Sequence, residues 1–306
     1  MTSEGERQEG PGDELAREFD GLRTLLVGAA YRVVGSVADA EDAVQEAWLR
    51  WAAVDRAEVR DVRAYLLTIT TRQALNRLRR QRSRREDYVG PWLPEPIATT
   101  PDPADEVELA DSISMAMLVV LESLSPLERV AFVLHDVFGL SFSEVAVALD
   151  RTEPAVRQLA SRARGHVHAR RPETVGRRQH DDVVRGCLAA LAQGDIEGFV
   201  SLLAPDVVLI SDGGGLRRAA LKPIHGVDKV VRWCVGVMSR PDTEAPLTVG
   251  LDHLNGETAI VLYAGGPPDT VVFLTIEPRG VTAVHIVRNP EKLSRLTHLP
   301  AVRHPG

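Results

Sequence analysis

The chain has 306 residues, of which 44% are hydrophobic, 36 are Lys or Arg, 43 are Asp or Glu and two are Cys. This length allows two or three domains, and the composition excludes both a wholly disordered protein and a secreted scaffold held by disulfides. No segment reaches the roughly 18 consecutive apolar residues of a membrane helix, and the N-terminus is acidic where a signal peptide is basic. We therefore expect a cytoplasmic protein with no membrane contact. Cys187 and Cys234 lack the spacing of a metal or redox motif, so we expect two small buried side chains and no metal site.

Two separate basic blocks stand out in a chain whose formal net charge is -7. Residues 72–85 hold seven Arg and no acid, and residues 151–178 hold eight Arg against two Glu. Basic runs are usually solvated surfaces, but basic runs on helices favour contact with nucleic acid.

Residues 13–86 predict a compact domain of three helices. Residues 1–12, rich in Glu and Gly, predict a disordered leader. Apolar residues spaced three and four apart then predict a helix that ends at Gly35, followed by a helix over residues 39–53. A third helix begins near Val62 and runs directly into the first basic block.

Residues 87–111 predict a linker, because five Pro fall within this short span and interrupt any helix. Trp92 and Leu93 place two large apolar side chains on a segment that has no core of its own. Exposed apolar groups of this kind usually dock onto another surface.

Residues 112–171 predict a second helical domain that contains a helix-turn-helix. Ser125 and Ser141 are each followed three residues later by Glu, which predicts the N-terminal caps of two helices. Three residues then separate the helix that ends near Leu149 from a final helix, which is typical of a helix-turn-helix. In a helix-turn-helix, the second helix enters the major groove of DNA. The polar face of this final helix carries Arg157, Gln158, Ser161 and Arg162.

Residues 176–293 predict a third domain of the α+β class, followed by a tail over residues 294–306. Helical patterns up to Leu202 precede a strand at residues 207–210. Four later β-rich segments are separated by Asn-Gly, Gly-Gly and Arg-Gly turns. These features predict a curled antiparallel sheet packed against helices.

The two helical domains resemble the extracytoplasmic-function (ECF) sigma factors of bacterial RNA polymerase. The resemblance rests on the segment DAEDAVQEAWLRW at residues 39–51, the helix over residues 64–80 and the helix-turn-helix over residues 141–164. These motifs occur in the family's order and cover roughly residues 13–171. The resemblance implies two all-α sigma domains, in a protein that binds core RNA polymerase and promoter DNA and is not an enzyme.

The resemblance also implies roles for individual residues. The acidic and amide face of the second helix would bind the polymerase through Asp42, Gln45, Glu46 and Leu49. The third helix would bind the upstream melting element of the promoter through Arg72, Asn76, Arg77, Arg79 and Arg80. The final helix of the second domain would read a more distal element as duplex DNA through Arg157, Gln158, Ser161 and Arg162.

The whole chain resembles the sigma-J type of this family, which carries a SnoaL-like, cone-shaped C-terminal domain. The segments WLPEP (residues 92–96), DGGG (residues 212–215) and NPEKL (residues 289–293) carry this resemblance. The chain departs from the type at Leu216, where Lys usually follows the glycines. The resemblance implies that the cone is a fused regulator in place of a separate anti-sigma protein, with Trp92 and Leu93 in the groove between domains. Its regulatory interface would comprise Trp92, Leu93, Asp212, Gly213, Gly214, Asn289 and Pro290.

Cone-shaped domains of this kind often hold enzymes, and the candidate acids and bases here are Asp206, Asp212, His225, His253 and His285. Nothing in their spacing singles out a pair, so we predict no catalysis and no cofactor. The sequence leaves open whether the cone binds a small ligand. We expect the free chain to be a monomer. Two other functions also stay open: a helix-turn-helix repressor, which would leave the first basic block and the linker unexplained, and an isomerase or cyclase carried by the cone.

Overall fold

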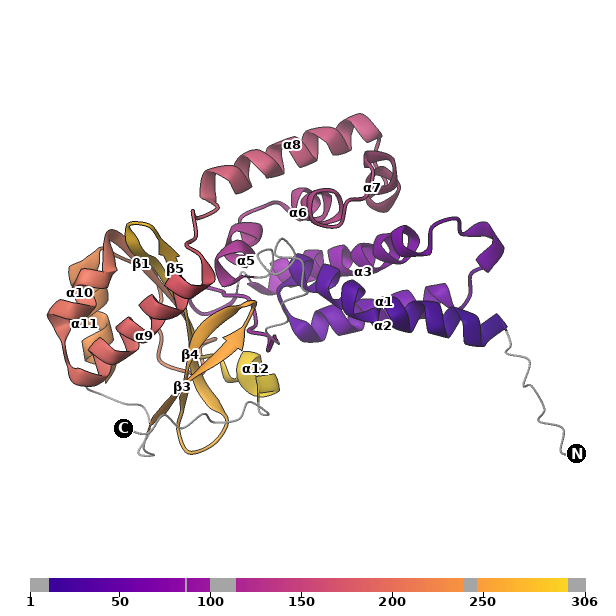
Figure 1. The fold of residues 1–306 in the computed structure, drawn as a ribbon. Helices are drawn as coiled ribbons and strands as arrows, with labels where there is room; N and C mark the ends of the chain where they lie inside the picture. The colour runs from indigo at the N-terminus through magenta and orange to yellow at the C-terminus, as the bar shows by residue number, and fades with distance from the viewer. Residues whose placement is uncertain (1–10, 86, 100–113, 239–246, 297–306) are drawn as a thin grey trace, which may run out of the picture. The chain divides into compact units, whose positions relative to one another are not determined.

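The computed structural model describes residues 11–85, 87–99, 114–238 and 247–296 (Figure 1). The chain folds into two compact units. The first contains residues up to 82 together with residues 121–168, and the second contains residues 83–120 together with the residues from 169 onward. The described part of the linker therefore belongs to the same unit as the C-terminal domain.

Three long helices form the N-terminal part of the first unit: α1 (Pro11–Val34), α2 (Val37–Trp51) and α3 (Val62–Arg85), with a short 3-10 helix, η1 (Arg56–Glu58), before α3. α1 ends where Gly35 adopts a left-handed conformation, and the Ser36 side chain caps α2 by accepting the backbone N–H of Asp39. The inner face of α2 is buried through Ala40, Ala43, Val44, Ala47 and Trp51. The predicted three-helix fold is confirmed.

A second group of helices completes the first unit: α6 (Pro126–Phe132), the π-helical segment η2 (Val133–Val137), α7 (Phe142–Leu149) and α8 (Glu153–Arg170). Ser125 and Ser141 each form a capping box with the Glu three residues later, as the sequence predicts. Asp150 adopts a left-handed conformation in the turn between α7 and α8. This turn gives the predicted helix-turn-helix, with α8 as its second helix.

The second unit contains a six-stranded sheet in the order β2-β1-β6-β5-β4-β3. Its strands are β1 (Leu203–Asp212), β2 (Ile224–His225), β3 (Thr248–Leu254), β4 (Glu257–Tyr263), β5 (Pro268–Glu277) and β6 (Gly280–Val287). Its helices are α9 (Arg177–Gln193), α10 (Ile196–Leu202), α11 (Val227–Met238), α12 (Pro290–Leu293) and the 3-10 helix η3 (Ser294–Leu296). The predicted α+β class is confirmed.

One strand pair differs from the expected antiparallel sheet. β1 and β6 run parallel, whereas all other paired strands are antiparallel. The difference arises because β1 is joined to β6 not by a tight turn but through α11 and four intervening strands, β2 to β5. Local turn residues predict hairpins, and they carry no information about a pairing between strands so far apart.

The sheet carries a hydrophobic core on each of its two faces. On one face, α9, α10 and α11 pack against the strands through residues such as Val184, Phe199 and Val230. On the other face, Leu93 of the linker and Met115 at the start of α5 (Met115–Glu122) pack against the strands. The linker therefore contributes to the core of the C-terminal domain.

Element boundaries differ from the sequence-based predictions at both ends of the chain. α1 begins at Pro11, and the rest of the predicted leader lies outside the described residues. The predicted tail begins inside the fold, because Leu296 is buried in the core with Leu93; the rest of the tail lies outside the described residues. Residues 100–111 of the predicted linker also lie outside the described residues.

Candidate functional site

The outer face of α2 carries the residues predicted to bind the polymerase. Asp42, Gln45 and Leu49 are exposed and Glu46 is half-buried. Leu49 is 66% exposed although it is a large apolar side chain. An exposed leucine among acidic and amide groups can combine apolar burial with charge complementarity when a basic partner binds.

Arg77 of α3, predicted to bind DNA, lies against this acidic face. Its Nη1 is 3.1 Å from Asp42 Oδ2, and its Nη2 is 2.5 Å from Glu46 Oε1. Asp42 and Glu46 are partly exposed, so each ion pair adds little to stability. The contacts nevertheless join one predicted DNA-binding residue to two predicted polymerase-binding residues.

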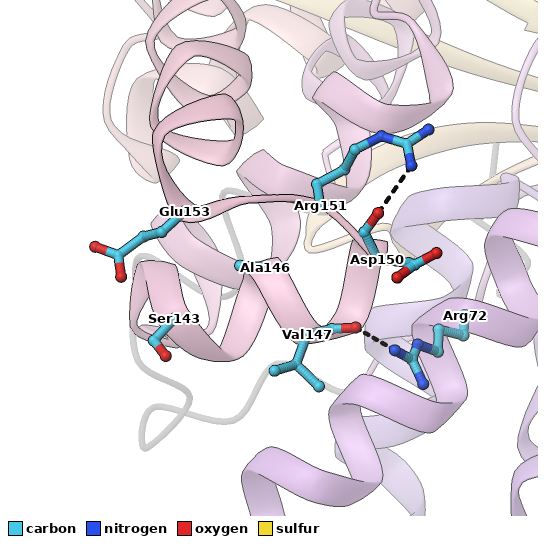
Figure 2. A pocket seen from close by; sticks show the side chains of 7 residues that line it. All are labelled: Arg72, Ser143, Ala146, Val147, Asp150, Arg151 and Glu153. Atoms are coloured by element: carbon cyan, nitrogen blue, oxygen red, sulfur yellow. Dashed lines mark hydrogen bonds between the residues drawn. The ribbon is translucent and has the colours of Figure 1, made fainter.

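Arg72 of α3 contacts the first helix of the helix-turn-helix (Figure 2). Its Nη2 donates to the Val147 carbonyl, as the dashed line in Figure 2 shows. Its Nε donates to the Ala148 carbonyl at 2.8 Å. Both carbonyls lie in the last turn of α7, where unpaired carbonyls and the helix dipole favour a cation. The contact borders a pocket of about 430 Å³ that is lined by Arg72, Ser143, Ala146, Val147, Asp150, Arg151 and Glu153. In this conformation Arg72 binds protein carbonyls instead of a phosphate.

The remaining residues predicted to bind DNA are exposed: Asn76, Arg79 and Arg80 on α3, and Arg157, Gln158, Ser161 and Arg162 on α8. Two of the α8 side chains are held by carboxylates. Arg157 pairs with Glu153 one turn earlier on α8, and Arg162 Nε is 2.8 Å from Glu128 Oε1. The exposed surface of α8 therefore presents ordered guanidinium groups beside Gln158 and Ser161.

A buried carboxylate, Asp212 at the end of β1, connects the linker to the cone. Its Oδ1 accepts the Tyr88 hydroxyl at 2.6 Å and the Gly214 backbone N–H at 3.1 Å. Its Oδ2 accepts the Leu93 backbone N–H at 2.9 Å and Lys292 Nζ at 2.6 Å. Asp212 is fully buried, and these four donors offset the high cost of removing a carboxylate from water.

Lys292 and Tyr88 surround this carboxylate with further contacts. Lys292 Nζ also donates to the Leu93 carbonyl and lies 3.1 Å from the centroid of the Trp92 ring, a cation–π contact. Asn289 Nδ2 donates to the Tyr88 hydroxyl at 3.0 Å. Burial and the hydrogen bond to Asp212 raise the pKa of Tyr88, so this hydroxyl stays protonated and donates. We call this cluster the Asp212 hub, and it comprises Tyr88, Trp92, Leu93, Asp212, Asn289 and Lys292.

The glycine segment after Asp212 packs closely against Asn289 of the hub. Gly214 has φ +61°, and a Cβ built on it would lie 2.4 Å from Asn289 Nδ2. Pro290, at the first position of α12, directly follows Asn289, the N-cap of that helix. Leu216, where the sigma-J type usually has Lys, is 57% exposed, so this departure changes the surface next to the hub.

A second set of hydrogen bonds fixes the linker on the free edge of β3. The Thr99 backbone N–H donates to the His253 carbonyl at 3.0 Å, and the Asn255 N–H donates to the Ile97 carbonyl at 2.9 Å. Ala98 and Leu254 form an antiparallel β-bridge between these bonds. The linker is therefore attached to the cone at two places.

No hydrogen bond joins any two of the five candidate acids and bases, all of which lie among the described residues. Asp212 is bound within the hub, and Asp206 pairs with Arg279 at the surface. His225 is exposed, and the imidazole of His253 bonds to Thr99 and Arg177. His285 is buried, and burial lowers its pKa to about 4.

Cys187 and Cys234 are free thiols within the core that includes α9 and α11. Burial raises the pKa of Cys187 to about 12 and that of Cys234 to about 11, which makes both poor nucleophiles. Across the described ranges, no group of three or more His, Cys, Asp or Glu side chains is arranged to hold a metal ion. No helix in that part of the chain is long and apolar enough to cross a membrane.

Tyr88 and Lys292 are functional candidates that the sequence reasoning missed. Neither was predicted to belong to the regulatory interface, yet they supply two of the four donors to Asp212. A signal for Lys292 existed, because it is one of only three Lys in the chain and lies inside the NPEKL segment. Nothing in the sequence distinguishes Tyr88 from an ordinary linker residue.

Comparison with known proteins agrees with this division of the chain. The sigma-70 region 2 family matches residues 19–84, and the sigma-70 region 4 family matches residues 114–167. The chain is 42% identical over 295 residues to the ECF RNA polymerase sigma factor SigJ of Mycobacterium tuberculosis, covering 90% of this chain and 92% of that protein. It is 31% identical over 288 residues to the "Probable ECF RNA polymerase sigma factor SigI" of the same species, covering 93% and 96%. The crystal structure of M. tuberculosis SigJ matches with a TM-score of 0.72 at 38% identity, covering 91% of this chain and 98% of that one.

Replacing Lys292 by Met should destabilise the second unit, because it leaves the buried Asp212 carboxylate without its cation. We expect a loss of about 3 kcal/mol in the free energy of unfolding, measured by chemical denaturation. Lys229→Met, at an exposed position of α11, is the matched control and should change this value little. A loss for Lys292→Met no larger than that of the control would contradict the hub.

The buried His285 should make the second unit sensitive to acid. The folded state binds the proton only near pH 4, whereas the unfolded state binds it near the ordinary pKa of about 6.5. Protonation therefore favours unfolding, and up to about 3 kcal/mol of stability should be lost as the pH falls from 6.5 to 4.

The test is the free energy of unfolding of His285→Leu as a function of pH. This variant should lose less stability than the original chain between pH 7 and pH 4.5. His225→Gln, at an exposed position of β2, should keep the original slope. Equal slopes for all three proteins would show that His285 does not cause the acid sensitivity.

Proposed function

The chain belongs to the extracytoplasmic-function family of RNA polymerase sigma factors, and from that premise we propose how its surfaces divide the work of initiation. It is a sigma factor with two sigma-70 domains and a C-terminal α+β cone. Sigma factors bind core polymerase and direct it to promoters. In this chain, α2 binds the polymerase, α3 binds the melting element and α8 reads the distal element.

The polymerase-binding face is formed by Asp42, Gln45, Glu46 and Leu49. The exposure of Leu49 supports this assignment, because a large apolar side chain gains most when a partner covers it. The surrounding carboxylates and amide select a basic partner surface. The partner displaces Arg77 from Asp42 and Glu46 as it binds.

The promoter-binding faces lie on two helices. On α3 they comprise Arg72, Asn76, Arg77, Arg79 and Arg80, and on α8 they comprise Arg157, Gln158, Ser161 and Arg162. Arginine binds phosphates in a sequence-independent way, while Gln158 and Ser161 on the exposed face of α8 can read base edges. No chemical step is needed, so we assign no catalytic residue and no cofactor.

The conformation described here is a resting form, and the engagement of Arg72 is the observation that carries this proposal. Arg72 binds the carbonyls of Val147 and Ala148, so the melting helix and the helix-turn-helix hold each other. The two helices serve different promoter elements, and DNA can bind Arg72 only after these bonds break. The free chain therefore has to open before it initiates transcription.

The cone restrains this opening by holding the linker. The Asp212 hub fixes Tyr88 and Leu93, and the edge of β3 fixes Ile97 and Thr99. The part of the linker that is held at these two places is not available to lengthen the connection between the sigma domains. In this form of regulation, the cone holds the linker at Trp92 and Leu93.

The remaining predictions are consistent with this function. The cone acts as a regulator, and we assign it no enzymatic activity, since no hydrogen bond brings two of its candidate acids and bases together. The described residues give no support for a small ligand in the cone. The protein works in the cytoplasm, where polymerase and promoters are found, and it is a monomer until it binds the polymerase.

Replacing Leu49 by Asp should weaken binding of the full chain to purified core polymerase at least about tenfold, as expected for an apolar residue at the centre of an interface. Leu221→Asp, at a position on the cone that is also 66% exposed, is the control and should bind normally. Equal affinity of the two variants would remove Leu49 from the polymerase interface.

Replacing Trp92 by Ala should release the linker and raise the affinity for core polymerase about threefold to tenfold, because binding no longer competes with the cation–π contact to Lys292. Run-off transcription with limiting protein should rise in parallel. Val89→Ala, at an exposed linker position, is the control. Unchanged or lower affinity in a folded Trp92→Ala protein would refute restraint by the cone.

A further inference from the structure

A stack of three side chains links the helices of the helix-turn-helix. The rings of His135 and Phe142 are stacked, with centroids 3.9 Å apart and planes inclined by 28°. The guanidinium carbon of Arg157 lies 4.5 Å from the centroid of the Phe142 ring. Since rings in face-to-face contact leave no room between them, Arg157 must cover the opposite face of Phe142.

Phe142 is held in place independently of Arg157. It is the first residue of α7 and lies inside the capping box of Ser141 and Glu144, so its backbone is fixed by the helix N-terminus. His135 supports the ring from behind, and its Nδ1 bonds to the Leu140 carbonyl at 2.7 Å. The ring is therefore a fixed support rather than a side chain that follows Arg157.

The stack restricts how Arg157 can present its guanidinium group. Contact with an aromatic face limits the orientations that are open to a planar guanidinium, and Glu153 accepts a hydrogen bond from Nη2. The side chain of Arg157 nevertheless remains 58% exposed, so the other N–H donors stay accessible. Bidentate recognition of a guanine edge requires a guanidinium group held in one plane.

We propose that Phe142 is a positioning residue for promoter recognition, which holds the Arg157 guanidinium in the plane with which it reads a base pair of the distal promoter element. This inference rests on the proposed function, which assigns Arg157 to that element. Phe142 itself need not touch DNA, since Arg157 lies between the ring and the groove.

Arg162 provides an internal comparison on the same helix. Its Nε is held by Glu128, which belongs to the capping box of Ser125. Because Glu128 and Phe142 lie on different helices, the base preference that depends on Arg162 should not respond to changes at Phe142.

The test uses holoenzyme reconstituted from core polymerase and the full chain. It transcribes a template pool in which the distal element is randomised, and the bases enriched among transcribed templates give the preference at each position. Arg157→Ala should reduce the preference about fivefold to a hundredfold at one or two positions. Phe142→Leu should reduce the preference at those same positions by about threefold to tenfold.

Conservative variants and controls distinguish positioning from folding. Phe142→Tyr should restore the preference, because the aromatic face is kept. Val237→Ala, at a partly exposed position of α11 in the cone, should leave it unchanged. Arg162→Ala should alter a different position, and Phe142→Leu should not affect that position.

Two results would overturn the inference. If Arg157→Ala removes a preference and Phe142→Leu lowers transcription equally from all templates, or not at all, then Phe142 has no positioning role while the assignment of Arg157 stands. If Arg157→Ala changes no base preference, then the assignment of Arg157 to the distal element fails, and the role of Phe142 fails with it.

Discussion

The buried carboxylate of Asp212 is the interaction on which the attachment of the linker to the cone depends. A carboxylate with no exposure to solvent has to be matched by donors, and here they are Lys292, the Tyr88 hydroxyl and two backbone N–H groups. Two of the four donors belong to the linker. The cone therefore supplies only two of the four donors to its buried carboxylate, and the linker completes the set.

Charged side chains of the sigma domains also have intramolecular partners. Arg72 satisfies carbonyls at the end of α7, and Arg77 pairs with carboxylates of α2. Both arginines lie in the block that the sequence assigns to promoter DNA. In the proposed function these charges bind promoter phosphates and polymerase, and the intramolecular ion pairs are weak enough to be exchanged because they are partly exposed.

The sequence predicted the helices of the sigma domains well, because periodic apolar residues, Ser–Glu capping boxes and Gly35 are local signals. It also predicted that Trp92 and Leu93 would dock onto another surface of the protein. It singled out the WLPEP, DGGG and NPEKL segments as the source of the regulatory interface. It could not predict that the three segments meet at one carboxylate, because these contacts join residues 80 or more positions apart. The parallel pairing of β1 with β6 and the donor role of Tyr88 were missed for the same reason: no local pattern encodes them.

Locking the linker onto the cone tests most directly whether the linker has to leave the cone before initiation. Ala98 and Leu254 face each other in an antiparallel bridge, where Cα atoms lie close enough for a disulfide between introduced cysteines. We predict that the oxidised Ala98→Cys, Leu254→Cys chain binds core polymerase poorly and gives little run-off transcript, and that reduction restores both, with Ala98→Cys alone as the control. Full transcription by the oxidised chain would contradict the claim that the linker has to leave the cone before initiation.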